Sequence, residues 1–143
     1  NSQYSAVIPL FIKAVLRNKQ PLIYGDGEQS RDFTYIANAV SANLKACVAP
    51  NAAGKSYNVA CGQRYSLNQI LEMLGQIVGR KITARYVDSR PGDIKHSMAD
   101  ITAAQTDLGY TPEFDFKFGL EETFKWFTRV FTSSTPVGGI KIE

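Results

Sequence analysis

The stretch SLNQILEMLGQIVG, residues 66–79, has the pattern of one amphipathic helix and sets the fold class of the chain. Ser66 and Gln69 form a capping box at its start, and Gly79 follows its last apolar residue. The apolar residues between them recur at the spacing of one helix face: Leu67, Ile70, Leu71, Leu74, Ile77 and Val78. This stretch therefore predicts a helix that buries one side in a core.

Short apolar stretches with the length of strands lie on both sides of this helix, and more helices lie further out. The expected strands cover residues 22–24, 57–60 and 82–87. The other expected helices cover residues 7–15, 36–48, 100–108 (with Asp100 as a cap and Leu108-Gly109 at the end) and 120–131. Strands that alternate with helices predict an α/β protein with a small sheet and about five helices.

The composition is that of a globular protein of 143 residues with a net charge of +3. No run approaches the roughly 18 apolar residues of a membrane span, and no dense basic patch indicates nucleic-acid binding. Cys47 and Cys61 have neither metal-ligand spacing nor enough partners for a disulfide framework, so no metal site is expected. Free thiols favour a reducing compartment, and we expect a cytoplasmic protein.

Two short polar motifs, GDGEQSRDF at residues 25–33 and RPGDIKHS at residues 90–97, each place an arginine in or beside a turn. A guanidinium donates two parallel hydrogen bonds to phosphate and stays charged, so Arg31 and Arg90 together can hold a diphosphate. The Pro-Gly pair after Arg90 suits a type II turn, which would bring Asp93 back toward Arg90. The alternative, a surface turn with a local pair contributing under ~1 kcal/mol, stays open on spacing alone.

Three further polar or aromatic residues lie in or beside these motifs. Tyr24 ends an apolar strand and either packs against a nucleobase or belongs to the core. His96, the single histidine of the chain, is more typical of a surface position than of catalysis. Ser97 is a small polar residue without a pattern of its own.

Six motifs follow one another along the chain: YSAVIP (4–9), GDGEQSRDF (25–33), YNVA (57–60), RPGD (90–93), HSMAD (96–100) and LGYTP (108–112). In this order they resemble the C-terminal part of the extended short-chain dehydrogenase/reductase family, the nucleotide-sugar epimerases and dehydratases. Within that family the pattern is most similar to the UDP-N-acetylglucosamine 4-epimerases. The resemblance covers about residues 2–127, nearly the whole chain.

The resemblance implies a binding site for the nucleotide end of a UDP-sugar. By position, Arg31 and Arg90 match the two arginines on the diphosphate, and Asp93 matches the acid that contacts the ribose. Ser97 falls where the family limits room beside the C2 substituent, and its small side chain would admit an N-acetylated sugar. The other residues that the resemblance places at the nucleotide are Ala6, Val7, Leu22, Tyr24 and Phe33.

The family's chemical machinery does not occur in this sequence. None of the seven tyrosines begins a Tyr-x-x-x-Lys pair, and no Gly-x-x-Gly-x-x-Gly stretch is present. We therefore expect no catalytic residue here, a Rossmann domain that is missing, and NAD bound by the intact enzyme but not by this fragment.

The resemblance also implies a domain organisation. Residues 1–131 form the substrate-binding domain, and within them residues 33–60 contribute a helix and a strand to the absent cofactor domain. Residues 132–143 form a flexible tail. The intact enzyme is expected to be a homodimer. Cut free, residues 57–60 would be an exposed strand edge through which the fragment self-associates.

The leading hypothesis is the UDP-sugar-binding portion of an NAD-dependent UDP-glucose/UDP-N-acetylglucosamine 4-epimerase, which inverts C4 through a 4-keto intermediate. A UDP-glucuronate decarboxylase or a nucleotide-sugar dehydratase shares the RPGD motif and remains an alternative. A non-catalytic nucleotide-sugar-binding or regulatory module is the alternative of another class.

Overall fold

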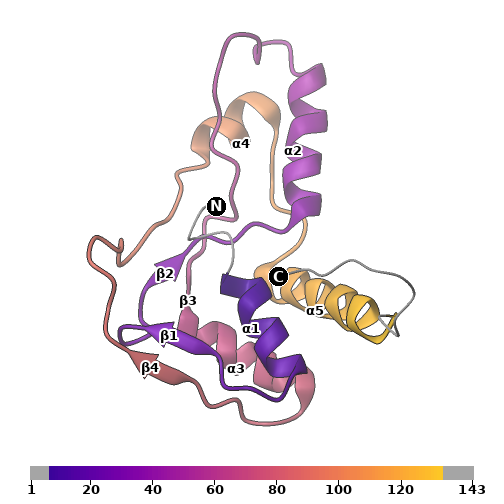
Figure 1. Ribbon diagram of the computed structural model, residues 1–143. Coiled ribbons are helices and arrows are strands. Elements are labelled where there is room, and N and C mark those ends of the chain that lie inside the picture. Colours follow the sequence, from indigo (N-terminus) through magenta and orange to yellow (C-terminus); the bar gives the residue numbers. More distant parts are fainter. Residues whose placement is uncertain (1–6, 134–143) are drawn as a thin grey trace, which may run out of the picture.

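The computed structural model describes residues 7–133, in which five helices alternate with four short strands (Figure 1). In chain order these are α1 (Val7–Leu16), β1 (Leu22–Tyr24), β2 (Ser30–Arg31), α2 (Ile36–Val48), β3 (Tyr65–Ser66), α3 (Leu67–Val78), β4 (Arg85–Val87), α4 (Thr102–Leu108) and α5 (Phe116–Ser133). The α/β class and the five helices are confirmed. Within this described part, no helix has the length and apolar character needed to cross a membrane.

The strands pair two by two instead of forming one sheet. β1 lies parallel to β4 with Tyr24 opposite Val87, and β2 lies antiparallel to β3 with Ser30 opposite Ser66. The strand predicted at residues 82–87 is shorter, because only Arg85–Val87 pairs with β1. The first pairing brings residues that follow Tyr24 and Val87 to the same end of the small sheet.

Helix α3 forms as its sequence predicts and anchors the larger of two cores. The Ser66 and Gln69 side chains make both bonds of the capping box, and Gly79 ends the helix at a φ of 68°, where a Cβ would be strained. One face of α3 packs with α1, β1 and α5. The buried residues of this core are Phe11, Ile12, Ile23, Leu67, Ile70, Leu71, Leu74, Phe116 and Leu120.

A second, smaller core lies where α2 and α4 run side by side (Figure 1). Its centre is Tyr110, which is fully buried and donates its hydroxyl to the Ala60 carbonyl at 2.9 Å. The other buried members are Ala42, Ala60, Ile101, Ala104 and Leu108.

The prediction of a strand at residues 57–60 is wrong. No strand pairs with this segment in the described part of the chain, and its groups bond to the α4 region instead. The Tyr57 hydroxyl donates to the Asp107 carboxylate at 2.9 Å, and the Asn58 amide donates to the Asp100 carbonyl at 3.2 Å. Apolar residues that were expected to enter a sheet thus pack against a helix.

The apolar face from which helix α2 was predicted is exposed to solvent. The apolar residues at its four-residue spacing, which we call the α2 stripe, are Ile36, Val40, Leu44 and Val48, with exposures of 67%, 49%, 65% and 82%. The buried residues of this helix are Asn38 and Ala42. Since apolar stripes of helices normally face a core, this surface is unusual for a helix within one domain.

Two predicted boundaries differ from the structure at the C-terminal end. Helix α5 begins at Phe116, four residues before the predicted start, and continues through Thr132 and Ser133, which were expected in the tail. The rest of the predicted tail and Ala6 lie outside the described residues.

Candidate functional site

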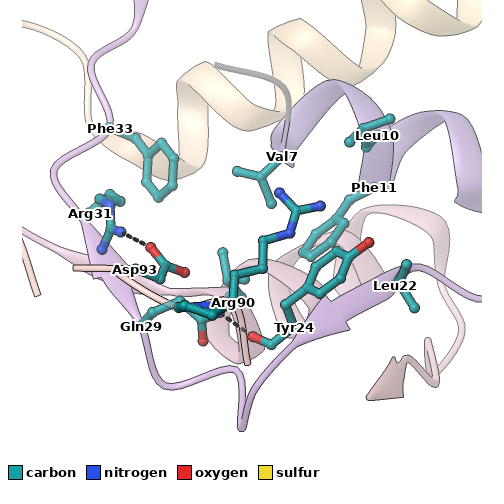
Figure 2. A pocket seen from close by; sticks show the side chains of 12 residues that line it. Val7, Leu10, Phe11, Leu22, Tyr24, Gln29, Arg31, Phe33, Arg90 and Asp93 are labelled. Carbon is teal, nitrogen blue, oxygen red and sulfur yellow. Dashed lines mark hydrogen bonds and ion pairs between the residues drawn. The ribbon is translucent and has the colours of Figure 1, made fainter. Parts of the chain in front are cut away.

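The two arginine motifs meet at one cavity of about 140 Å³ between α1, β1 and the segment after β4 (Figure 2). Seven of the residues singled out from the sequence line it: Val7, Leu22, Tyr24, Arg31, Phe33, Arg90 and Asp93. The sequence did not single out five further lining residues: Leu10, Phe11, Gln29, Leu67 and Pro91. The 56 residues between the two motifs, 34–89, are therefore folded so that both arginines line one cavity.

The parallel pairing of β1 with β4 explains how Arg90 reaches this cavity. Because Tyr24 lies opposite Val87, the chain that leaves β4 passes directly beside the end of β1. Arg90 then extends back over the Tyr24 ring, with its guanidinium carbon 3.8 Å from the ring centroid (Figure 2). This distance is well within the roughly 6 Å of a cation–π contact.

Arg31 is held on the opposite side of the cavity by groups from two segments. One terminal nitrogen donates to the Ser30 carbonyl at 2.9 Å and to the Lys95 carbonyl at 3.3 Å. The other donates to the Asp93 carboxylate at 2.9 Å, forming an ion pair (Figure 2). These contacts restrict the rotamers of Arg31 before any ligand arrives, which lowers the entropy cost of binding.

The turn after Arg90 forms as predicted, but its acidic residue has a different partner. The Asp93 amide donates to the Arg90 carbonyl at 3.3 Å, and Gly92 has a φ of 80°, as position three of a type II turn requires. The turn brings Asp93 back as expected, but its carboxylate forms its ion pair with Arg31 and not with Arg90. The turn is directed toward β2, where Ser30 bonds to the segment at Lys95 and Ser97.

Neighbouring polar groups support the glycine turn of the first motif. Gln29 donates its amide to the Tyr24 carbonyl at 2.6 Å and so ties the two ends of the turn together. Asp26 accepts the Glu28 amide at 2.9 Å, and this hydrogen bond lowers the pKa of Asp26. Gly27 has a φ of 79°, and a Cβ there would overlap the Asn68 side chain, so this position favours glycine.

Ser97 and His96 lie outside the cavity lining. Ser97 is exposed, and its amide donates to the Ser30 carbonyl at 3.0 Å. His96 Nδ1 and the Ser30 hydroxyl are 2.9 Å apart and share a hydrogen bond. His96 is exposed, as expected of a surface histidine, and its hydrogen bond joins two segments of the fold. The cavity does not reach Ser97.

The lining combines two cations with aromatic and aliphatic walls. Such a cavity suits a ligand that has an anionic group, which arginine binds with its planar fork, and a flat apolar part. Among the residues that the structure describes, no group of three or more His, Cys, Asp or Glu side chains could hold a metal ion.

The small α/β fold and this arginine-lined cavity define a chain of the nucleotide-sugar epimerase and dehydratase class. The chain belongs to the family described as GDP-mannose 4,6 dehydratase, whose model matches residues 2–123. The resemblance to extended short-chain dehydrogenases/reductases is thereby confirmed.

Comparison with individual proteins gives the same class. The chain is 36% identical to a UDP-glucuronate 4-epimerase of Thermodesulfobacterium geofontis, over 81% of this chain and 36% of that protein. A UDP-glucuronic acid 4-epimerase structure from Bacillus cereus, in complex with UDP-glucuronic acid and NAD, has a TM-score of 0.82 and 33% identity, over 87% of this chain and 40% of that one.

A UDP-N-acetylglucosamine 4-epimerase from Methanobrevibacter ruminantium, in complex with UDP-N-acetylmuramic acid, has 42% identity and a TM-score of 0.77. The match covers 91% of this chain and 41% of that one. The chain thus spans about two fifths of the length of the proteins that it resembles.

Proposed function

We propose that this chain is the UDP-sugar-binding portion of an NAD-dependent UDP-sugar 4-epimerase. The observation that carries the proposal is that one cavity is lined by both Arg31 and Arg90 together with apolar and aromatic side chains. Similar proteins whose structures contain a UDP-sugar support this assignment. The chain matches only part of those proteins, and the activity of a whole enzyme is part of the proposal.

In this proposal each lining residue has a distinct role in binding. Arg31 and Arg90 donate to the diphosphate oxygens, and the Asp93 carboxylate accepts from a ribose hydroxyl. Leu22 and Tyr24 lie along the base. Val7 and Phe33 close the apolar side of the nucleotide site.

The sugar would extend from the diphosphate beyond the cavity. Ser97 is exposed on the segment that follows Asp93, and its small side chain would leave room for an N-acetyl group at C2. The identity of 42% to a structure that holds UDP-N-acetylmuramic acid supports this specificity.

The residues present do not fit NAD. The sequence contains no Gly-x-x-Gly-x-x-Gly stretch and no Tyr-x-x-x-Lys pair, so neither a dinucleotide site nor a proton relay is built from it. We therefore assign this chain to substrate binding and place the redox chemistry at C4 in the remainder of a longer enzyme.

Titration calorimetry with UDP and with NAD tests this division of roles. We expect a saturable binding isotherm with UDP and none with NAD. We also expect no epimerisation of UDP-glucose when NAD is added. UDP is expected to bind because the cavity offers two cations and an aromatic wall. Saturable NAD binding together with no response to UDP would contradict the proposal.

We also propose that the α2 stripe is covered by the cofactor domain of the whole enzyme, to which residues 33–60 would contribute. Its four apolar side chains are between 49% and 82% exposed, and the relatives are more than twice as long as this chain. The helix buries its other face against α4, so the stripe is left for a separate partner.

The isolated chain is expected to self-associate, because exposed apolar stripes bury surface by pairing. We expect the apparent mass in size-exclusion chromatography to rise with concentration, and Leu44→Lys to reduce this rise by placing a charge in the stripe. Glu121→Lys on α5 serves as the control for an added lysine. A clean monomer at all concentrations would contradict the expectation.

A further inference from the structure

The contact between Arg90 and Tyr24 occupies the place that the proposed function assigns to the base. The Arg90 side chain crosses the cavity and lies over the Tyr24 ring at 3.8 Å, between that ring and Val7 (Figure 2). The remaining cavity of about 140 Å³ is smaller than the roughly 300–1,000 Å³ typical of ligand pockets. A base can therefore stack on Tyr24 only after Arg90 has moved away.

The two arginines of the cavity differ in what balances their charge. Arg31 has an ion pair with Asp93 and donates to two backbone carbonyls. Arg90 takes part in none of the ion pairs found within residues 7–133, and its guanidinium lies on the Tyr24 ring. The guanidinium of Arg90 can therefore exchange its contact with the Tyr24 ring for an anion more easily than Arg31 can exchange its ion pair.

We propose that Arg90 makes this site selective for nucleoside diphosphates over nucleosides. In the ligand-free chain Arg90 covers the face of Tyr24. A ligand with a diphosphate draws the guanidinium onto its phosphate oxygens and thereby uncovers the ring for its own base. The inference rests on the proposed function and specifies how the site rejects a base that carries no phosphate.

The exchange is favourable for one ligand class and unfavourable for the other. A charge-assisted hydrogen bond to phosphate is stronger than an exposed cation–π contact, so UDP more than compensates for the contact that it breaks. Uridine must break the same contact and has no phosphate to offer in return. The base and the diphosphate are therefore coupled through a single side chain.

Removing the Arg90 side chain should consequently change the two affinities in opposite directions. We expect Arg90→Ala to weaken UDP binding by about tenfold or more, since it removes charge-assisted hydrogen bonds. We expect the same substitution to strengthen uridine binding by about 2- to 5-fold, which corresponds to the usual strength of an exposed cation–π contact. Titration of both ligands into both proteins, by calorimetry or by NMR shift perturbation, measures these changes.

Arg85→Ala is the matched control, because Arg85 is exposed on β4 but does not line the cavity, and both affinities should remain unchanged. The Tyr24 ring resonances provide a second readout. Arg90→Ala and the addition of UDP to the native chain should both shift them, since both remove the guanidinium from the face of the ring.

The outcomes separate this inference from the function on which it rests. UDP binding that falls in Arg90→Ala while uridine binding falls or stays constant would overturn the selectivity and leave the diphosphate role intact. A native chain that binds no UDP would overturn both. Opposite changes in the two affinities would support both.

Discussion

Arg31→Ala is expected to weaken UDP binding by about 10- to 100-fold. A hydrogen bond to a charged group contributes about 1.5–3 kcal/mol, and Arg31 would donate directly to the diphosphate. The substitution also leaves the Asp93 carboxylate, which Arg31 neutralises at 2.9 Å, facing the phosphates without its partner. Loss of attraction and added repulsion therefore act in the same direction.

Arg31→Lys shows whether the charge or the planar fork of Arg31 matters, and Arg85→Ala is the control. Arg31→Lys keeps the charge but loses the planar fork that bonds to Ser30, Lys95 and Asp93 together, and an intermediate loss is expected. Arg85→Ala removes a cation outside the cavity and should not change the affinity. Thermal unfolding of each variant checks that the fold is retained. Equal affinity of Arg31→Ala and the native chain would contradict the assignment.

Asn38→Ala is expected to cause the largest loss of stability of any single substitution considered. Asn38 is fully buried in α2 and donates to the Phe114 carbonyl at 2.7 Å. Its side-chain oxygen accepts the Glu113 and Phe114 amides at 3.0 and 3.1 Å. The substitution removes the partner of three backbone groups at once, and we expect a loss of about 2–4 kcal/mol in the free energy of unfolding.

Asn43→Ala is the matched control on the same helix. Asn43 is exposed and donates only to the Ala39 carbonyl at 2.7 Å, so its loss should stay within about 0.5 kcal/mol. Urea denaturation followed by circular dichroism measures both variants. Similar midpoints for Asn38→Ala and Asn43→Ala would show that the bonds from α2 to the segment before α5 contribute little.

The helices could be predicted from the sequence where their end signals are local. The capping box of Ser66 with Gln69 and the left-handed Gly79 depend only on residues next to the helix, and both form. The pairing of residues 57–60 depends on a strand elsewhere in the chain, and none lies beside them in the described part. The surroundings of α2 could not be predicted either. A four-residue spacing of apolar residues identifies an apolar helix face, but it does not show which part of the protein covers that face.

The site was predictable to a similar extent. Arg31 and Arg90 stand in recognisable motifs, and the fold brings them to one cavity. The partner of Asp93 was not predictable, because the local turn favours Arg90 while the observed ion pair depends on how the segment docks on β2. Gln29 lies within the first motif but carries no charge, and its role is visible only in the hydrogen bond that its amide donates to the Tyr24 carbonyl.

The most direct test of the central claim is a calorimetric titration of UDP into the native chain and into the Arg31→Ala/Arg90→Ala variant. The proposed function predicts saturable binding to the native chain and loss of that binding in the folded variant, because both cations of the cavity are removed. Equal binding of UDP by the two proteins would contradict the claim that this cavity holds the diphosphate.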